Sequence, residues 1–401
     1  MGMPLLAAAL FLLAPAEDLI DQALKALDAR QPAAAEALLR KAVGEDANDY
    51  AAHFHLALAL SLQNKDEEAI TEYRRTLELK PGLFEADLNL GILLLRDKRP
   101  GEAMPVLKEA AEAKPQDARP KGYLAQALLD SGEPAEAEQL YRGLLGNEPK
   151  NAAAQAGLAK ALRAQDKLSD AAEAFRAAGN KEGLLEIAAE YEKRGQQPDA
   201  IAIYQQFSDD PAVGRRLGQL QIDSKNAEAA IVNLEEVVKK NPTSQNRLAL
   251  ADAYKLAGQP AKVLEQLQAA VAVEPGNFAL RMALGRQLRD TGKLLPAAQH
   301  FQTAAKLDPQ SVDAWNELAS ALLVSQNYTE GLMALDHVRA LGKERPGNYF
   351  LRAITLDKLK MKPQALIEYK AFLDASKGTL PDQEFQARQR MRIIELELKK
   401  K

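Results

Sequence analysis

Residues 84–117 read FEADLNLGILLLRDKRPGEAMPVLKEAAEAKPQD, and this stretch decides the fold. Apolar residues recur every three or four positions in both halves, which predicts two amphipathic helices. Gly91 and Ala103 are small enough to let these helices approach closely, and large residues such as Leu107 fill the space beside them. Pro115 cannot continue the second helix and ends it. The stretch therefore predicts one helix–turn–helix hairpin.

The same pattern returns along most of the chain with a period of 34 residues. Five prolines mark this period, in two groups: Pro81, Pro115 and Pro149, and then Pro275 and Pro309. Alignment on these prolines places eleven units, which begin at residues 16, 50, 84, 118, 152, 181, 211, 244, 278, 312 and 346. The units that begin at 152 and 181 are four or five residues short, which removes about one helical turn. A repeated hairpin cannot cover its own apolar face, so we expect the units to stack.

This pattern resembles the tetratricopeptide repeat family, whose unit has 34 residues and the same spacing of small and large positions. The resemblance covers roughly residues 16–375 and implies an all-α fold, an α-solenoid in which about eleven hairpins form a right-handed superhelix. We expect five segments: a signal peptide (1–16), an N-terminal array (17–180), a shortened repeat that acts as a joint (181–211), a C-terminal array (212–378), and a capping helix with a basic tail (379–401). An ordinary deletion without mechanical meaning is the alternative for the joint. In the capping helix, one apolar stripe is expected, made of Phe385, Met391, Ile394 and Leu398.

Composition excludes several classes of function. The 401 residues contain no cysteine, which removes thiol nucleophiles, cysteine-ligated metals and disulfides, and the four histidines are scattered. Net charge is −4, so the chain lacks the basic field of a nucleic-acid-binding protein. Residues 1–200 carry a net charge of −9 and residues 201–401 a net charge of +5. This asymmetry fits either a drift of surface charge along a repeat protein or a partner or self-contact that recognises it. Phosphate-binding loops and hydrolase or metalloprotease motifs do not occur in the sequence. We expect no enzyme, no cofactor and no metal.

The N-terminus has the form of an export signal. Residues 5–14 read LLAAALFLLA, and Ala14-Pro15-Ala16 follows the A-x-A pattern of a cleavage site. Ten apolar residues are too few to span a bilayer, which requires about 20. No Lys or Arg precedes Lys25, so an uncleaved anchor or a buried first helix remains open. The expected location is periplasmic or secreted, without stable membrane insertion after signal removal, and the alternative is cytoplasmic.

The resemblance also implies a binding surface, because in tetratricopeptide arrays the first helix of each unit lines a concave groove where peptide ligands lie. The corresponding positions are apolar in the early units and basic in the middle units. Alternatively, the apolar residues are simply buried under neighbouring helices, and the basic residues simply form a solvated face. The expected protein-binding groove residues are Phe54, Leu58, Leu88, Ile92, Gln126, Lys160, Arg163, Arg215, Gln219, Arg286, Arg289 and Asn316.

These observations predict a non-catalytic scaffold or adaptor in the cell envelope that binds a protein or peptide segment, and no nucleic acid. One alternative is a carbohydrate-binding or accessory subunit of an exopolysaccharide export or envelope assembly machine, although the groove positions are poor in the aromatic residues that stack on sugars. A cytoplasmic co-chaperone adaptor is the other alternative. The sequence does not determine the oligomeric state or the identity of the partner.

Overall fold

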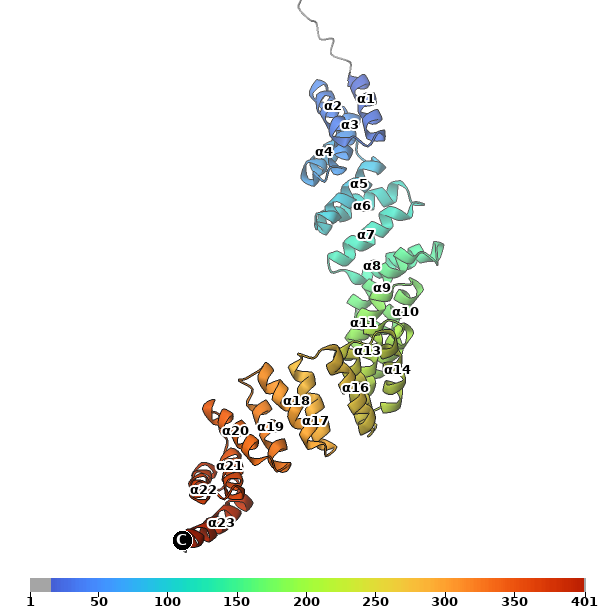
Figure 1. The fold of residues 1–401 in the computed structure, drawn as a ribbon. Coiled ribbons are helices and arrows are strands. Elements are labelled where there is room, and N and C mark those ends of the chain that lie inside the picture. Colours follow the sequence, from blue (N-terminus) through green and yellow to red (C-terminus); the bar gives the residue numbers. More distant parts are fainter. Residues whose placement is uncertain (1–15, 400–401) are drawn as a thin grey trace, which may run out of the picture. The chain divides into compact units, whose positions relative to one another are not determined.

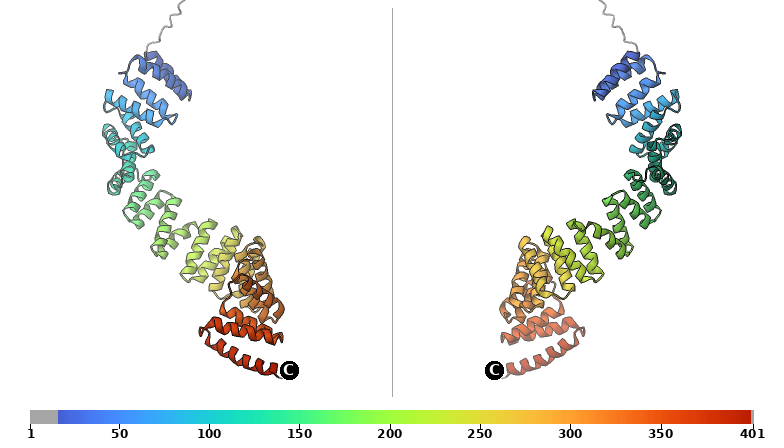
Figure 2. Two further views of the ribbon diagram at one scale, coloured as in Figure 1. Left: turned by 90° about the vertical axis from the view of Figure 1, so that its left-hand side faces the viewer. Right: turned by 90° about the vertical axis from the view of Figure 1, so that its right-hand side faces the viewer.

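The computed structural model describes residues 16–399, which form 23 α-helices and one short 3₁₀-helix, with no strand in that range. Eleven helical hairpins follow one another, stacked in chain order within each of two units (Figures 1 and 2). The first helices of the hairpins are α1 (Ala16–Asp28), α3 (Tyr50–Ser61), α5 (Phe84–Arg96), α7 (Ala118–Asp130), α9 (Ala152–Ala164), α11 (Lys181–Lys193), α13 (Pro211–Asp223), α15 (Ser244–Leu256), α17 (Phe278–Asp290), α19 (Val312–Val324) and α21 (Pro346–Lys358).

The second helices are α2 (Pro32–Glu45), α4 (Asp66–Leu79), α6 (Pro100–Ala113), α8 (Pro134–Asn147), α10 (Leu168–Ala177), α12 (Gln197–Tyr204), α14 (Ala227–Lys240), α16 (Pro260–Val273), α18 (Leu294–Leu307), α20 (Tyr328–Ala340) and α22 (Lys362–Ser376). The 3₁₀-helix η1 (Gln205–Phe207) extends α12, and α23 (Pro381–Lys399) ends the described chain. All eleven first helices begin at the residue that the repeat alignment predicts, which confirms the all-α solenoid.

The chain divides into two compact units, one up to Glu190 and one from Tyr191. Within each unit a helix packs on its hairpin partner and on the next hairpin, as α6 does on α5 and α7. The division lies inside the segment 181–211, which the sequence suggests as a joint; its mechanical role stays a prediction. The missing residues of the short hairpins come from their second helices, because α10 has 10 residues and α12 has 8, whereas α8 has 14.

A residue in the left-handed backbone conformation follows the first helix of every hairpin. In the hairpin of α5 and α6 this residue is Lys98, with φ of 59°. Its amide donates to the carbonyl of Leu95 at 3.0 Å, and the amide of Arg99 donates to Leu94 at 2.8 Å, the paired bonds of a Schellman motif. Glycine occupies the same place in only four hairpins, at Gly132, Gly195, Gly258 and Gly292. Stacking therefore holds the turn geometry even where the residue does not favour it.

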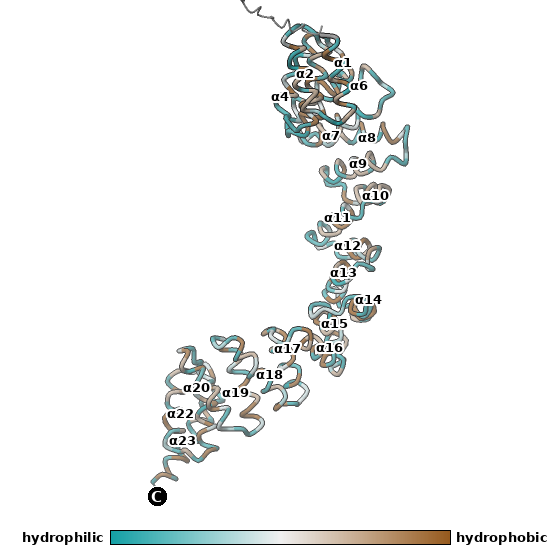
Figure 3. The backbone as a smooth tube through the Cα atoms, turned by 45° about the horizontal axis from the view of Figure 1, so that its top comes forward, coloured by the Kyte–Doolittle hydropathy of each residue, from teal (hydrophilic) through white to brown (hydrophobic). Residues whose placement is uncertain are grey.

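Small residues on the first helices set how closely the two helices of a hairpin approach. At Gly91 an added Cβ would lie 2.4 Å from two side-chain carbons of Leu107, so a larger residue would fit only if Leu107 moved. Leu107 itself is fully buried in the core that runs through the first four hairpins. This confirms the predicted roles of the two positions. Figure 3 shows hydrophobic and hydrophilic residues alternating along the helices, as expected when each helix has a covered and a solvated face.

Helix α23 covers the last hairpin, as predicted for a cap. Ala387 and Ile394 are fully buried in the core of α21 and α22, and Met391 and Leu398 pack against it. The expectation for Phe385 is wrong, because its side chain is 63% exposed. An angle of 100° per residue places Phe385 on the opposite side of the helix from Ile394.

The predicted signal peptide lies outside the residues that the structure describes, apart from Ala16, where α1 begins. No helix within residues 16–399 combines the length and the apolar character needed to cross a bilayer.

Candidate peptide-binding surface

The apolar groove residues of the early hairpins contribute largely to the core. Leu88 on α5 is only 4% exposed, so it packs between helices and does not face a ligand. Phe54 on α3 and Ile92 on α5 are half-buried and pack against the same core. Leu58 is also half-buried. The structure therefore leaves a narrower apolar strip here than the repeat positions alone suggest.

Three of the basic groove residues have acidic partners on the following first helix. Arg163 on α9 forms ion pairs with Glu186 and, at 3.2 Å, with Glu190 on α11. Arg286 on α17 contacts Glu317 on α19 at 3.1 Å, and Arg289 binds Glu317 as well as its neighbour Asp290, the latter at 2.9 Å. These pairs link successive hairpins and largely neutralise the charge that a ligand would meet. Of the other predicted cations, Lys160 and Arg215 are exposed.

The three amides among the predicted residues have local partners. Gln126 donates to Asp130 at 2.7 Å and Gln219 donates to Asp223 at 2.9 Å, each one turn along the same helix. Asn316 accepts a hydrogen bond of 2.6 Å from Asn348 on α21. Because all three are half-buried, they can still offer part of their polar surface to a ligand.

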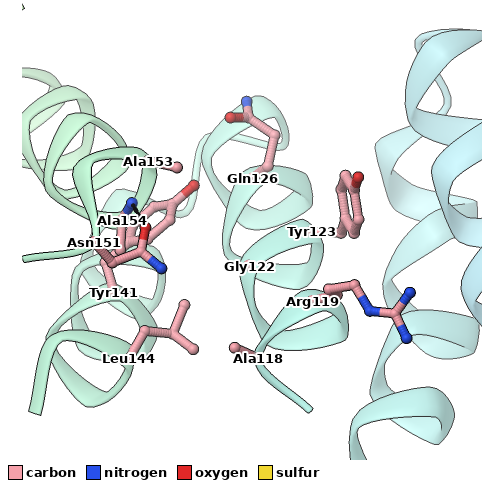
Figure 4. A pocket seen from close by; sticks show the side chains of 10 residues that line it. All are labelled: Ala118, Arg119, Gly122, Tyr123, Gln126, Tyr141, Leu144, Asn151, Ala153 and Ala154. Carbon is pink, nitrogen blue, oxygen red and sulfur yellow. Dashed lines mark hydrogen bonds between the residues drawn. The ribbon is translucent and has the colours of Figure 1, made fainter. Parts of the chain in front are cut away.

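A pocket of about 380 Å³ lies between α7, α8 and α9 in the first unit. Figure 4 shows how its walls are arranged: Arg119 and Tyr123 project from one side of α7 toward the preceding hairpin, and residues of α8 and α9 face the other side of α7. The lining residues are Ala118, Arg119, Gly122, Tyr123, Gln126, Tyr141, Leu144, Asn151, Ala153 and Ala154. We call this space the α7–α9 pocket.

The pocket exists because the side chains around it are small. Gly122 has no Cβ, and one added there would make only an ordinary contact of 4.0 Å with Leu144. Ala118 on α7 and Ala153 on α9 carry only a methyl group and leave much of the space between the two helices unfilled. Of the ten residues that line the pocket, only Gln126 is among the groove residues predicted from the sequence. The run of alanine and glycine at the groove positions of α7 and α9 was the available signal.

The pocket has an apolar floor and a polar edge. Leu144 and the alanine methyl groups line it, and burial raises the pKa of Tyr141 to about 12, so this phenol stays neutral and can donate a hydrogen bond. Arg119 at the edge is exposed and held by Asp117, whose carboxylate it contacts at 2.7 Å. Such an arrangement suits one apolar side chain with polar groups beside it.

In the second unit, a smaller pocket of about 350 Å³ lies between α13 and α15. Arg215 and Gln219, both predicted, line it together with Asp252 and Arg216. Burial raises the pKa of Asp252. Arg216 already binds Glu192. This pocket is more polar than the α7–α9 pocket, and both of its arginines are exposed.

Among the described residues, no three His, Cys, Asp or Glu side chains gather closely enough to hold a metal ion. The acidic residues described above bond to basic partners and amides, either across hairpins, as Glu317 does, or within their own helix, as Asp130 does.

Family models for the tetratricopeptide repeat match residues 20–84, 94–148, 124–183, 248–311 and 282–340, which together make up more than half of the chain. The chain belongs to the tetratricopeptide repeat family. Members of this family are typically non-catalytic scaffolds that bind other proteins, and a protein-interaction role follows for this chain.

Similar solved structures span different parts of the chain. MamA (residues 41 to the end) from Desulfovibrio magneticus is 23% identical, covers 41% of this chain and 92% of its own, and has a TM-score of 0.39. A tetratricopeptide repeat protein from Parabacteroides merdae is 14% identical over 68% of this chain and 98% of its own, with a TM-score of 0.38. A chain of the Naa15/Naa10 complex bound to HypK is 12% identical over 95% of this chain and 79% of its own, with a TM-score of 0.36. No curated protein matches the sequence.

Proposed function

We propose that this chain is a scaffold whose first unit binds a segment of a partner protein, with one apolar side chain of that segment in the α7–α9 pocket. The observation that carries the proposal is the pocket itself, an apolar space of about 380 Å³ between the first helices α7 and α9 and the second helix α8. Its volume lies within the range of sites that take a small organic group.

The charge near the pocket suggests the rest of the ligand. Lys160 is exposed and lies seven residues after Ala153 on α9, so both are on the same face of this helix, about 10 Å apart along its axis. A segment with an apolar side chain and an acidic residue two helical turns away would reach both. Arg163 contributes less to such a contact, because Glu186 and Glu190 already bind it.

Site-specific photocrosslinking in native cells tests this proposal. A photoreactive phenylalanine at Ala153 should give discrete crosslinked partners, because this position lies at the pocket. The matched control is the same residue at Gly143 on α8, which is exposed and has nothing within 4 Å of an added Cβ. Identical products from both positions, or no product from Ala153, would contradict a binding role for the pocket.

We also propose that the chain is exported and acts in the periplasm or outside the cell. The support is the apolar run of residues 5–14 with Ala14-Pro15-Ala16 after it. N-terminal mass spectrometry of the native protein should find a chain that begins near residue 17 in an envelope or extracellular fraction. An intact start in the cytosol would instead favour the cytoplasmic adaptor.

The carbohydrate-binding alternative gains little support from the tryptophan, which lies on α19 and not at the α7–α9 pocket. The single tryptophan, Trp315, stacks on His337 with ring centres 4.0 Å apart, and its indole N–H donates to the carbonyl of Pro309 at 3.0 Å. Its ring is therefore already covered on one face by an internal partner.

A further inference from the structure

Helix α23 has a second apolar face that the last hairpin does not cover. Phe385, Ile393 and Leu396 are 63%, 45% and 60% exposed. At 3.6 residues per turn, Phe385 and Leu396 lie within about 20° of each other, three turns apart. Ile394, on the opposite side, is fully buried against the hairpin of α21 and α22. Figure 2 shows α23 as the last layer of the second unit, with no helix of that unit beyond it.

This outer face differs from what an end cap needs. A terminal helix that only covers a repeat array has a polar outer side, which keeps the end of the stack soluble. Single exposed apolar residues are common, but three on one face of a terminal helix form a stripe. Burying them would require another helix.

The charges at the two ends of the stripe indicate which helix. Asp382 lies three residues before Phe385, and Lys399 lies three residues after Leu396; both charged side chains are exposed. The outer face therefore has an acid at its N-terminal end and a base at its C-terminal end, with Phe385, the exposed Arg392 and Leu396 between them. An identical helix in the antiparallel direction would set Asp382 against Lys399 of the second copy, and Phe385 against Leu396 of the second copy.

We propose that a second copy of the chain covers this face, through antiparallel packing of the two α23 helices about a twofold axis. A twofold interface uses the same patch on both copies, and this stripe is complementary to itself in that direction. Gln389 and Arg392 meet near the axis, where an amide can accept from a guanidinium. The two Arg392 side chains also approach each other there, and one helix buries little area, so we expect a reversible dimer with a small interface.

Sedimentation velocity of the full chain across a wide concentration range tests this at low ionic strength. The wild type should pass from monomer to dimer as its concentration rises. Leu396→Asp and Phe385→Asp should each weaken the dimer at least tenfold, because a charge enters the apolar contact. Val232→Asp is the control, since Val232 on α14 is 63% exposed and lies away from the stripe. Circular dichroism should show the same helix content for all variants.

A charge exchange tests the antiparallel direction. Asp382→Lys and Lys399→Asp should each weaken the dimer about two- to fivefold, the range of exposed ion pairs. Mixing the two single variants should restore association, because only the mixed dimer pairs opposite charges at both ends. A wild type that is monomeric at every concentration, a dimer that Leu396→Asp leaves intact, or a mixture that associates no better than its components would overturn the proposal.

Discussion

Replacing Asp87 by asparagine should stabilise the protein at neutral pH. Asp87 lies on α5, is fully buried, and neither of its carboxylate oxygens has a hydrogen-bond partner in the structure. Burial, with a smaller effect from the negative charge of Glu109, raises the pKa of Asp87 from its usual 3.8 to about 6. The buried carboxylate is therefore destabilising once it is ionised.

The equivalent residue of other hairpins shows what this position normally does. Lys121, Gln155, Arg281 and Trp315 occupy the same place on their first helices, and each donates to the carbonyl six residues earlier, at 2.6, 3.2, 2.9 and 3.0 Å. An ionised Asp87 has no proton to donate. Asparagine has nearly the same shape as aspartate and carries no charge, so the variant removes the cost of an ionised carboxylate at this buried position.

The size of the effect follows from the pKa. A folded-state pKa of about 6 against 3.8 when unfolded means that the folded chain binds more protons between these values, so stability falls as pH rises through this window. The full loss, reached near pH 7, is about 3 kcal/mol. Asp87→Asn should recover about 2–3 kcal/mol at pH 7 and less than about 1 kcal/mol at pH 4.

Urea unfolding at the two pH values measures this, and hydrogen exchange of α5 and α6 shows whether the gain is local, as expected in a repeat array. The control is Asp313→Asn, an exposed acidic residue near the start of α19, which should change stability by about 0.5 kcal/mol or less. An equal gain for Asp87→Asn at both pH values, or destabilisation at pH 7, would refute the reasoning.

Three further predictions concern the packing of the hairpins. Gly91→Ala should destabilise by about 1–2 kcal/mol in urea unfolding despite the better helix propensity of alanine, because the new Cβ meets Leu107; an unchanged midpoint would mean that the helices separate freely. Lys167 and two other donors lower the pKa of Glu138 to about 2, so its stabilising effect is present above pH 4.5 and is lost as pH falls toward 2. Glu138→Gln should therefore lower stability by about 1–2 kcal/mol at pH 7 and have little effect at pH 2, as measured by urea unfolding. Truncation after Gly378 uncovers the last hairpin and should lower its melting temperature and cause aggregation in light scattering; a soluble product of unchanged stability would contradict the role of α23 as a cap.

The repeat pattern alone predicts where the first helices begin, because caps, prolines and small residues act locally. All eleven starts follow from it, including those of the two short hairpins. Side-chain partners across hairpins could not be predicted in this way. Arg163 and Arg289 look like free groove cations until Glu186 and Glu317 on the next first helix are placed beside them.

The other differences between the sequence prediction and the structure come from helix angle, from burial by neighbouring helices and from small residues. Phe385 belongs to the apolar spacing of α23, yet it faces away from Ile394, so a stripe drawn by spacing alone mixes both faces. Leu88 occupies a groove position but is buried by neighbouring helices. The α7–α9 pocket depends on the small size of Gly122 and Ala153. A sequence search that looks for functional side chains does not detect a space that exists because side chains are small.

Filling the α7–α9 pocket is the most direct test of the proposed function. Gly122→Leu places an apolar side chain in the pocket, whereas Gly143→Leu makes the same change on the exposed side of α8. Both variants replace glycine within a helix and should fold at least as well as the wild type. Isothermal titration with the partner segment crosslinked at Ala153 should show affinity at least tenfold weaker for Gly122→Leu, since an apolar side chain worth about 1.5–3 kcal/mol is displaced, and unchanged for Gly143→Leu. Equal affinity of both variants for that segment would contradict the account.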